Sequence, residues 1–319
     1  MDPQFPTGDV IDVRLGDGVR LHARAFGDPD APVTVVLLHG WTLDHRVWHR
    51  QLTDVPDGLP TPARILAYDA RGHGRSSSSP RQSKNLGQLG DDLAELLAQI
   101  APTGPVVLVG HSLGGMTIME YADRHPDDFA ARVAGLVLVA TTAVGHSHTV
   151  YGLPARLGGL IRLAETSGAY VLARCGAWRP HRAIQYVLRP GLRWLLFGEG
   201  ADPLDVRLTT MAVARATLRA IGGFRPSIGV QQRLETLAAL APVPTRLLVG
   251  DRDRLTPVRC AEDIAEALGG VDVTILAGAG HMLMLERADE VTAAILDVVG
   301  DVVAANAESE GPTDLPLAA

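Results

Sequence analysis

Short continuous runs of aliphatic residues recur along most of this chain and are separated by segments with helical spacing. Such runs are typical of strands that are buried on both faces of a parallel sheet. We expect strands of this kind at residues 32–38, 64–69, 106–109, 133–140, 245–249 and 271–276. Residues 9–26 instead alternate apolar and polar positions around Gly16-Asp17-Gly18, which predicts an antiparallel hairpin at the sheet edge. Strands that alternate with helices indicate an α/β fold with right-handed crossovers.

The alternation of strands and helices stops in residues 141–244. This segment has helical apolar spacing and several glycine and proline breaks, but no run that suggests a strand. We therefore expect a helical insertion at 141–244 within a core formed by residues 9–140 and 245–303. The last helix of the core should run from about residue 288 to residue 303. Residues 304–319 are polar and contain proline, which predicts a disordered tail.

The composition is that of an ordinary soluble globular protein. The 319 residues are 46% hydrophobic and 20% charged, which is ample for one large core. The first residues, MDPQFPTGDVID, carry acids and prolines where an export signal needs basic and then apolar residues, and no apolar stretch is long enough to span a bilayer. We therefore expect a cytoplasmic location. The net charge of -7 argues against general nucleic-acid binding.

The stretch Gly110-His111-Ser112-Leu113-Gly114 carries the strongest chemical signal. It lies between the strand at 106–109 and a helical pattern that begins at Met116. A sharp strand-to-helix turn forces its central residue into a sparsely populated backbone region, and side chains two positions before and after it would collide. Glycine occupies both positions, as in the G-x-S-x-G nucleophile elbow, and the start of the helix favours negative charge. We predict that Ser112 is a nucleophile.

Three polar residues follow three different predicted strands, in the order Ser112, Asp253, His281. A serine hydroxyl becomes a useful nucleophile near neutral pH when an imidazole takes its proton, and the imidazole needs a carboxylate to orient it. Because the carboxyl ends of parallel strands meet at one edge of the sheet, we expect the three side chains to converge there. The cysteines, Cys175 and Cys260, are far apart and have no metal-ligand spacing, so we interpret both as buried or neutral thiols.

The chain resembles the α/β-hydrolase superfamily in five motifs: HGW at 39–41, YDARGHGRS at 68–76, GHSLGG at 110–115, GDRDRLTP at 250–257 and GAGHM at 278–282. The resemblance covers residues 10–303, and the insertion matches only as a cap domain in position and helical character. It implies an eight-stranded, mostly parallel sheet flanked by helices, with Ser112 as nucleophile, Asp253 as acid and His281 as base. It also implies that the backbone N–H groups of Trp41 and Leu113 bind the oxyanion.

Two acids in the GDRDRLTP motif are candidates for the carboxylate that orients His281. The spacing in similar proteins, G-x-x-D-x-x-x-P, favours Asp253, and it leaves Asp251 as a solvated or turn-capping group. We interpret the remaining motif histidines as structural groups that hydrogen-bond to the backbone; they are His39, His73 and His111. Asp69 and Arg71 are expected to hold their own loop together.

A serine rather than an aspartate at the elbow points to acyl chemistry. The resemblance therefore implies hydrolysis of carboxylic esters, with lipophilic or medium-chain acyl esters favoured, and this chemistry requires no metal or cofactor. Lactonase, thioesterase, C–C hydrolase, cofactor-free perhydrolase and acyltransferase reactions use the same triad and stay open. A non-catalytic ligand-binding protein on the same scaffold is a further alternative.

The insertion differs in charge from the rest of the chain. Residues 141–244 contain twelve arginines and five acids, a net charge of +7, so the rest of the chain carries -14. Charge on helices is often only a solvated face. Residues 189–197, however, interleave Arg189 and Arg193 with large apolar groups, a combination suited to an anionic interface or an amphiphilic substrate. We expect peripheral lipid contact through the cap.

Overall fold

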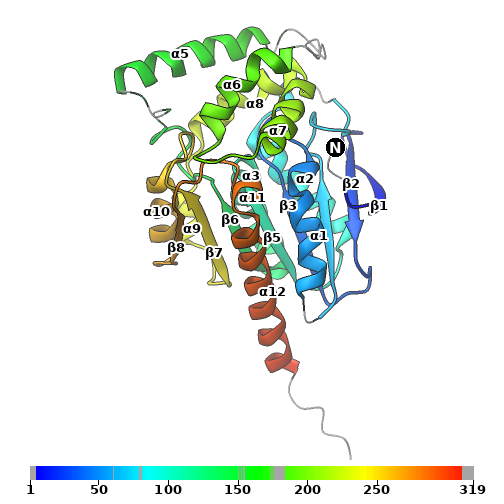
Figure 1. Ribbon diagram of the computed structural model, residues 1–319. Helices are drawn as coiled ribbons and strands as arrows, with labels where there is room; N and C mark the ends of the chain where they lie inside the picture. Colours follow the sequence, from blue (N-terminus) through cyan, green and yellow to red (C-terminus); the bar gives the residue numbers. More distant parts are fainter. Residues whose placement is uncertain are drawn as a thin grey trace, which may run out of the picture.

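A single β-sheet forms the centre of the structure. The computed structural model describes residues 5–59, 61–78, 81–149, 151, 153, 155–172, 174 and 184–310. Within these residues, eight strands form one sheet in the order β1-β2-β4-β3-β5-β6-β7-β8 (Figure 1). The strands are β1 (Asp9–Arg14), β2 (Arg20–Phe26), β3 (Val33–Leu38), β4 (Ala63–Tyr68), β5 (Val106–His111), β6 (Val133–Val139), β7 (Thr245–Gly250) and β8 (Val273–Leu276).

The sheet is mostly parallel, as predicted. The β1–β2 hairpin is antiparallel and β2 pairs antiparallel with β4, whereas every later pair, from β4–β3 to β7–β8, is parallel. The central strands β3 and β5 are buried at every position. This explains why their sequences are continuous aliphatic runs rather than alternating ones.

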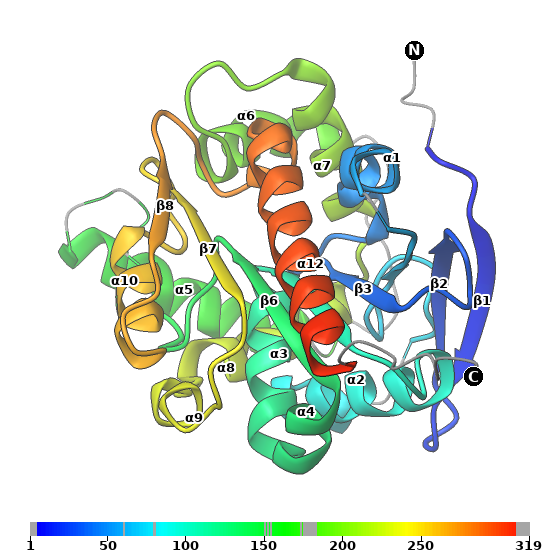
Figure 2. The same ribbon diagram turned by 90° about the horizontal axis from the view of Figure 1, so that it is seen from below.

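Helices cover both faces of the sheet (Figure 2). α1 and α12 pack against each other on one face, and α2, α3, α9 and α10 lie on the other. Successive strand residues point to opposite cores: Val36 and Leu38 join the cluster beneath α2 and α3, whereas Val35 and Leu37 join the cluster beneath α1 and α12. The helices of this body are α1 (His49–Gly58), α2 (Leu86–Ile100), α3 (Leu113–Arg124), α4 (Pro126–Arg132), α10 (Val258–Ala267), α11 (Leu283–Glu286) and α12 (Ala288–Glu310), with 3-10 turns η1 (His45–Trp48) and η2 (Arg81–Ser83).

The segment between β6 and β7 is helical in its described part and lies over the carboxyl edge of the sheet (Figure 1). α8 packs against α5, and α6 packs against α7. We call this layer the cap and the remainder the body. No helix in the described ranges is both long enough and apolar enough to cross a bilayer. The cap helices are α5 (Ala155–Leu172), α6 (Ile184–Leu196), α7 (Pro203–Arg215) and α8 (Leu218–Val230), and α9 (Leu234–Ala238) follows them and packs against α3 and α10 of the body.

The last helix corrects one expectation. We expected it to end near residue 303 and a disordered tail to follow over 304–319, but α12 continues to Glu310. The extra residues include Ala304, Ala305 and Ala307, and alanine is the best helix former. Their helical propensity outweighs the polar composition on which the expectation rested. Residues 311–319 lie outside the described part of the chain.

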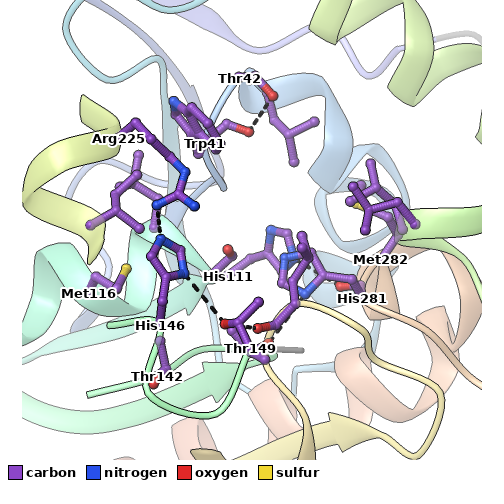
Figure 3. Close-up of a pocket in the computed structure, with 18 of the residues that line it drawn as sticks. Trp41, Thr42, His111, Met116, Thr142, His146, Thr149, Arg225, His281 and Met282 are labelled. Carbon is purple, nitrogen blue, oxygen red and sulfur yellow. Dashed lines mark hydrogen bonds between the residues drawn. The ribbon is translucent and has the colours of Figure 1, made fainter. Parts of the chain in front are cut away.

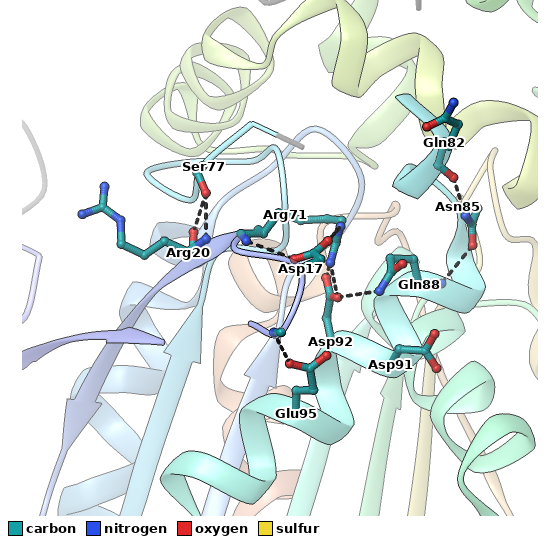
Figure 4. A network of polar contacts seen from close by, with 12 residues as sticks. Asp17, Arg20, Arg71, Ser77, Gln82, Asn85, Gln88, Asp91, Asp92 and Glu95 are labelled. Atoms are coloured by element: carbon teal, nitrogen blue, oxygen red, sulfur yellow. Dashed lines mark hydrogen bonds and ion pairs between the residues drawn. The ribbon is translucent and has the colours of Figure 1, made fainter. Parts of the chain in front are cut away.

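Arg71, in the loop after β4, holds together three segments that are distant in sequence (Figure 4). Its side chain is fully buried. Nε donates to Asp92 Oδ2 of α2 at 2.5 Å, and Nη1 donates to Asp17 Oδ2 of the β1–β2 turn at 2.8 Å. Gln88 Nε2 adds a hydrogen bond to Asp92 Oδ1 at 3.1 Å. The expected role of Arg71 in holding its loop is confirmed, and the bonds extend to the hairpin and to α2.

Asp69, two residues earlier, ties the same loop to the start of η1. Its Oδ1 accepts the His45 backbone N–H and Nδ1, both at 2.8 Å, and its Oδ2 accepts the Arg75 N–H at 2.7 Å. Burial alone would raise the pKa of Asp69, but the hydrogen bond and charge of His45 lower it overall. Asp69 is therefore a loop anchor, as expected.

Candidate active site

Ser112 stands on the sharp turn between β5 and α3. Its φ is +51°, a left-handed conformation that costs a non-glycine residue about 1–3 kcal/mol. A Cβ on Gly110 would lie 2.6 Å from the Gly115 nitrogen, and a Cβ on Gly114 would collide with the Leu38 carbonyl. Both glycines are therefore required by close backbone contacts, as the motif predicts.

His281 and Asp253 meet at the carboxyl edge of the sheet, in buried positions. His281 Nδ1 lies 2.7 Å from Asp253 Oδ2. Asp253 Oδ1 accepts the backbone N–H groups of Leu255 at 2.8 Å and Thr256 at 2.9 Å, and Thr256 Oγ1 donates to Oδ2 at 2.8 Å. These donors fix the carboxylate in a single orientation toward the imidazole. We did not single out Thr256 from the sequence; its position three residues after an aspartate in a loop was the available signal.

Asp251, the alternative acid, points elsewhere. It is exposed, and its Oδ1 accepts the backbone N–H of Gly278 at 2.7 Å. Gly278 begins the loop that carries His281 and has a φ of +71°. Asp251 therefore caps the turn that presents the imidazole and does not contact the imidazole itself.

A half-buried acid from α11, Glu286, fixes the other end of the His281 loop. It accepts backbone N–H groups from Gly280 at 3.1 Å, from Met282 at 3.2 Å and from Gly198 at 2.7 Å. Burial raises the pKa of Glu286, and the N–H donors oppose that change in part. Because a single glutamate among aliphatic residues gives no pattern, we did not identify it from the sequence.

The end of cap helix α6 is joined to the same loop through the backbone. The His281 N–H donates to the Leu196 carbonyl at 2.8 Å, and the Glu199 N–H donates to the Gly278 carbonyl at 2.8 Å. With the Gly198 N–H on Glu286, these bonds form a short ladder between residues 196–199 and 278–281. The cap and the loop that carries His281 are therefore held in one fixed relation.

Trp41 and Leu113 both line the cavity next to Ser112. Leu113 is the first residue of α3, so its N–H has no preceding helical turn to donate to. Trp41 follows β3, and its indole Nε1 donates to the Ala220 carbonyl of cap helix α8 at 3.4 Å. The oxyanion role of the two backbone N–H groups stays a prediction.

The three motif histidines that we interpreted as structural do bond to the backbone. His39 Nε2 accepts the Ala70 N–H at 3.0 Å, His73 Nδ1 lies 3.1 Å from the Arg71 carbonyl, and His111 Nε2 lies 3.0 Å from the His281 carbonyl. Burial lowers the pKa of all three imidazoles, that of His73 to about 3. They are therefore neutral at physiological pH.

A cavity of about 240 Å³ lies between the body and the cap (Figure 3). Ser112, His281 and Thr256 line its inner wall, and leucines, isoleucines and valine of the cap helices form much of the rest. Such a mainly apolar pocket with a few convergent polar groups is the usual form of a small-molecule site. The cap side chains that line it are Leu192, Leu195, Leu196, Val213, Ile221, Arg225 and Ile228.

Arg225 is the one arginine among the described residues that line the cavity, and it lies within a polar chain that crosses the cavity wall (Figure 3). Its guanidinium contacts His146 Nε2 and donates to Tyr151 Oη at 3.1 Å. His146 Nδ1 lies 3.4 Å from Thr149 Oγ1, which donates to the Leu255 carbonyl at 2.8 Å. The chain links cap helix α8 to the loop of Asp253. We did not predict it, because its members come from loops and helices without a shared motif.

One group of side chains in the described residues could hold a metal ion. Ligand atoms of His22, His45 and Asp69 lie within 4.8 Å of one another. Asp69, however, already accepts hydrogen bonds from His45 and Arg75, so a metal would have to displace the contacts that anchor the loop. Cys260 is buried in α10, and burial raises the pKa of its thiol to about 11. Cys175 lies outside the described residues.

Comparisons with known proteins agree with this geometry. Residues 35–294 match the alpha/beta hydrolase family. A pimeloyl-[acyl-carrier protein] methyl ester esterase from Chromobacterium violaceum is 28% identical over 271 residues, which cover 82% of this chain and 92% of that protein. A bifunctional esterase/perhydrolase from Acinetobacter calcoaceticus is 33% identical over 142 residues, 44% of this chain and 49% of its own length.

Solved structures show the same fold. A thermophilic esterase from Thermogutta terrifontis superimposes with a TM-score of 0.73 at 24% sequence identity. The match covers 92% of this chain and 99% of that one. At this identity the likeness establishes the architecture, and the side chains at the cavity decide the chemistry.

Proposed function

Because the chain belongs to the alpha/beta hydrolase family, we propose that it is a serine hydrolase that cleaves carboxylic esters through an acyl-enzyme intermediate. One observation carries the proposal. The paired His281 and Asp253 and the strained Ser112 come from three separate strand ends and line or adjoin a single apolar cavity. Nucleophile, base and orienting acid are the complete set that acyl transfer by serine requires.

In the proposed reaction, Ser112 Oγ attacks the ester carbonyl carbon while His281 Nε2 takes the hydroxyl proton. Nε2 is the basic nitrogen because Nδ1 is held by Asp253. The backbone N–H groups of Trp41 and Leu113 stabilise the oxyanion, and each such donor is worth about 3–4 kcal/mol in the transition state. His281 then protonates the leaving alkoxide. Water, deprotonated by the same imidazole, releases the acid and restores Ser112.

The cavity wall favours a lipophilic or medium-chain acyl group. Leucines and isoleucines from the cap form its outer side, and its volume is about 240 Å³. Each methylene buried there contributes about 0.8 kcal/mol to binding. Esters of small polar acids cannot use this wall. The cytoplasmic location expected from the sequence stays a prediction.

Covalent labelling tests the nucleophile. We expect a fluorophosphonate to label one site on the purified protein, at Ser112, because an activated hydroxyl reacts at neutral pH. Ser112→Ala should abolish labelling and p-nitrophenyl ester turnover, whereas Ser78→Ala, an exposed loop serine, should change neither. Labelling that persists in Ser112→Ala contradicts the proposal. If the protein hydrolyses lactones or forms peracids but does not hydrolyse esters, the proposed triad stands and the proposed ester substrate is wrong.

A further inference from the structure

One side of α5 exposes a stripe of large apolar side chains. Leu160 is 64% exposed and Leu163 is 66% exposed. Leu157 and Tyr170 are also exposed, and the four residues follow one another at intervals of three, three and seven residues, the spacing of one helix face, while exposed Val171 comes directly after Tyr170. Figure 1 shows α5 across the outer end of the cap, far from the sheet. An exposed apolar stripe of this kind marks an interaction surface.

α6 is apolar on two sides. Leu192, Leu195 and Leu196 face inward and line the cavity. Tyr186, Val187 and Trp194 are exposed on the same helix, and Val187 is 78% exposed. An ordinary surface helix needs only one apolar side, toward its own core. The Arg254 guanidinium of the body covers part of this side, since its carbon lies 5.1 Å from the centre of the Trp194 ring. Tyr186 and Val187 remain the most exposed apolar groups of α6.

The charge of these helices is positive. By sequence, residues 155–172 and 184–196 contain four arginines, Arg156, Arg162, Arg189 and Arg193, and one acid, Glu165. Arg174, just beyond α5, stacks its guanidinium over the Tyr170 ring, 3.3 Å from the centroid. Arginines beside exposed aromatic and aliphatic groups are typical of helices that lie at a lipid interface.

A hollow of about 360 Å³ between α6 and α7 adds to the positive charge. Three arginines line it, Arg189, Arg207 and Arg215, beside Tyr186 and Thr210. None of the described residues that line it is acidic. The positive charge of these arginines attracts anionic lipid headgroups.

We propose that the outer cap face docks on an anionic lipid surface. We define this face by the exposed apolar side chains Leu157, Leu160, Leu163, Tyr170, Val171, Tyr186 and Val187, together with Arg156, Arg174, Arg189 and Arg193. Its apolar side chains enter the acyl boundary, and its arginines meet the headgroups. The charge of +7 on the insertion against -14 on the rest of the chain turns the cap toward an anionic surface.

Charge also decides between a lipid surface and a second copy of the chain. A symmetric dimer through this face would place the same arginines of two copies opposite one another, because a two-fold interface is self-complementary. Like charges across an interface disfavour association. Anionic lipid complements the face in both charge and apolarity. This inference goes beyond the proposed ester chemistry, since it concerns a surface outside the cavity.

Sedimentation with lipid vesicles tests the proposal without any substrate. We expect the wild-type protein to bind vesicles of phosphatidylcholine with roughly a third phosphatidylglycerol, and to bind pure phosphatidylcholine at least about tenfold more weakly. Salt at 0.5 M should weaken binding to the anionic vesicles, because it shortens the Debye screening length to about 3–5 Å and so screens the attraction of the arginines for the headgroups. Absence of binding to anionic vesicles overturns the proposal.

Two double variants separate the contributions. Arg189→Gln with Arg193→Gln should weaken binding on the order of 30-fold, since each arginine near such a surface contributes about a factor of five. Leu160→Glu with Leu163→Glu should weaken binding by at least about tenfold. Matched controls are Arg14→Gln with Arg20→Gln, and Val10→Glu with Ile275→Glu, which change exposed residues of the body. Circular dichroism checks that each variant is folded.

Two outcomes would contradict the docking face. In the first, the cap variants bind vesicles as strongly as the body controls do, which means that the attraction is spread over the whole surface. In the second, light scattering after size exclusion finds a wild-type dimer that Leu160→Glu with Leu163→Glu converts to a monomer, which means that the face joins two copies. A monomeric wild type with cap-specific loss of vesicle binding supports the proposal, whatever the ester assay gives.

Discussion

The body and the cap treat polar and apolar side chains in opposite ways. At the carboxyl edge of the body, charged groups are buried and hydrogen-bonded: Asp69, Arg71 and Asp253 all hold loops in place. In the cap, apolar groups are exposed. Of the twelve large apolar side chains that are exposed in the described residues, ten belong to the insertion, and Val10 and Ile275 are the two in the body.

This difference separates two kinds of task. Buried hydrogen-bonded charges are costly to disturb, so they fix atoms to within the tolerance that a proton transfer needs. Exposed apolar groups contribute little to the fold and are available for contacts with other molecules. We therefore expect changes in the body to alter the chemical step and the stability, and changes in the cap to alter which molecules bind.

The largest expected effect is on kcat, and it distinguishes Asp253 from its neighbour Asp251. Asp253→Asn should lower kcat by about 10⁴-fold, because the amide no longer selects the imidazole tautomer that makes Nε2 basic. Asp251→Asn should stay within about tenfold of wild type, since Asp251 contacts the Gly278 N–H and not His281. Steady-state kinetics on one soluble ester measures both. The reverse ranking would move the orienting acid two residues upstream.

Acid should destabilise the body through its buried histidines. The pKa values of His39, His73 and His111 are lower in the folded chain than the ordinary 6.5, that of His73 being about 3. Their stabilisation is therefore complete above about pH 6.5 and is lost as the pH falls toward the folded values. His73 alone gives a loss of about 1.4 kcal/mol per pH unit below pH 6, and His39 and His111 add to it. Urea unfolding at pH 7, 6 and 5 measures the slope, and a flat profile would contradict the neutral state.

The smallest expected effect comes from the cap wall. Leu192→Ala should lower kcat/KM for a medium-chain ester by about tenfold and for an acetate ester by less, because the lost contacts touch only the longer chain. Val187→Ala, on the outer side of the same helix, is the matched control and should change neither value. An equal loss on both esters would mean that the cap acts on the chemical step, and the division between body and cap would fail.

Prediction from the sequence was most accurate for features that a single local rule decides. The buried runs at β3 and β5 are apolar because both sheet faces are covered, and the glycines at 110 and 114 are required by contacts of less than 3 Å. The choice of Asp253 over Asp251 came from the spacing in similar proteins, and the structure pairs Asp253 with His281. In each case a short motif in the sequence is enough to identify the residue.

The features that sequence could not supply depend on packing between distant segments. Leu192 and Val187 belong to one apolar stretch of α6, yet one lines the cavity and the other is exposed. Only the position of the helix over the body distinguishes them. Helix α1 was missed for a local reason, since its sequence HRQLTDVPDG is polar and contains Pro56 near its end. The predicted end of the last helix, near residue 303, was wrong because helical propensity outweighed the polar composition of the residues that follow.

The backbone ladder between residues 196–199 and 278–281 determines how this protein can be recombined with its relatives. A cap taken from another member and joined before Leu196 leaves the bonds to His281 and Gly278 intact. With a junction after Glu199, the foreign helix end must supply the same carbonyl and N–H groups. It must also have glycine at position 198, because any Cβ there would lie 2.7 Å from the Gly280 nitrogen. Chimaeras should therefore inherit residues 196–199 from the same parent as His281.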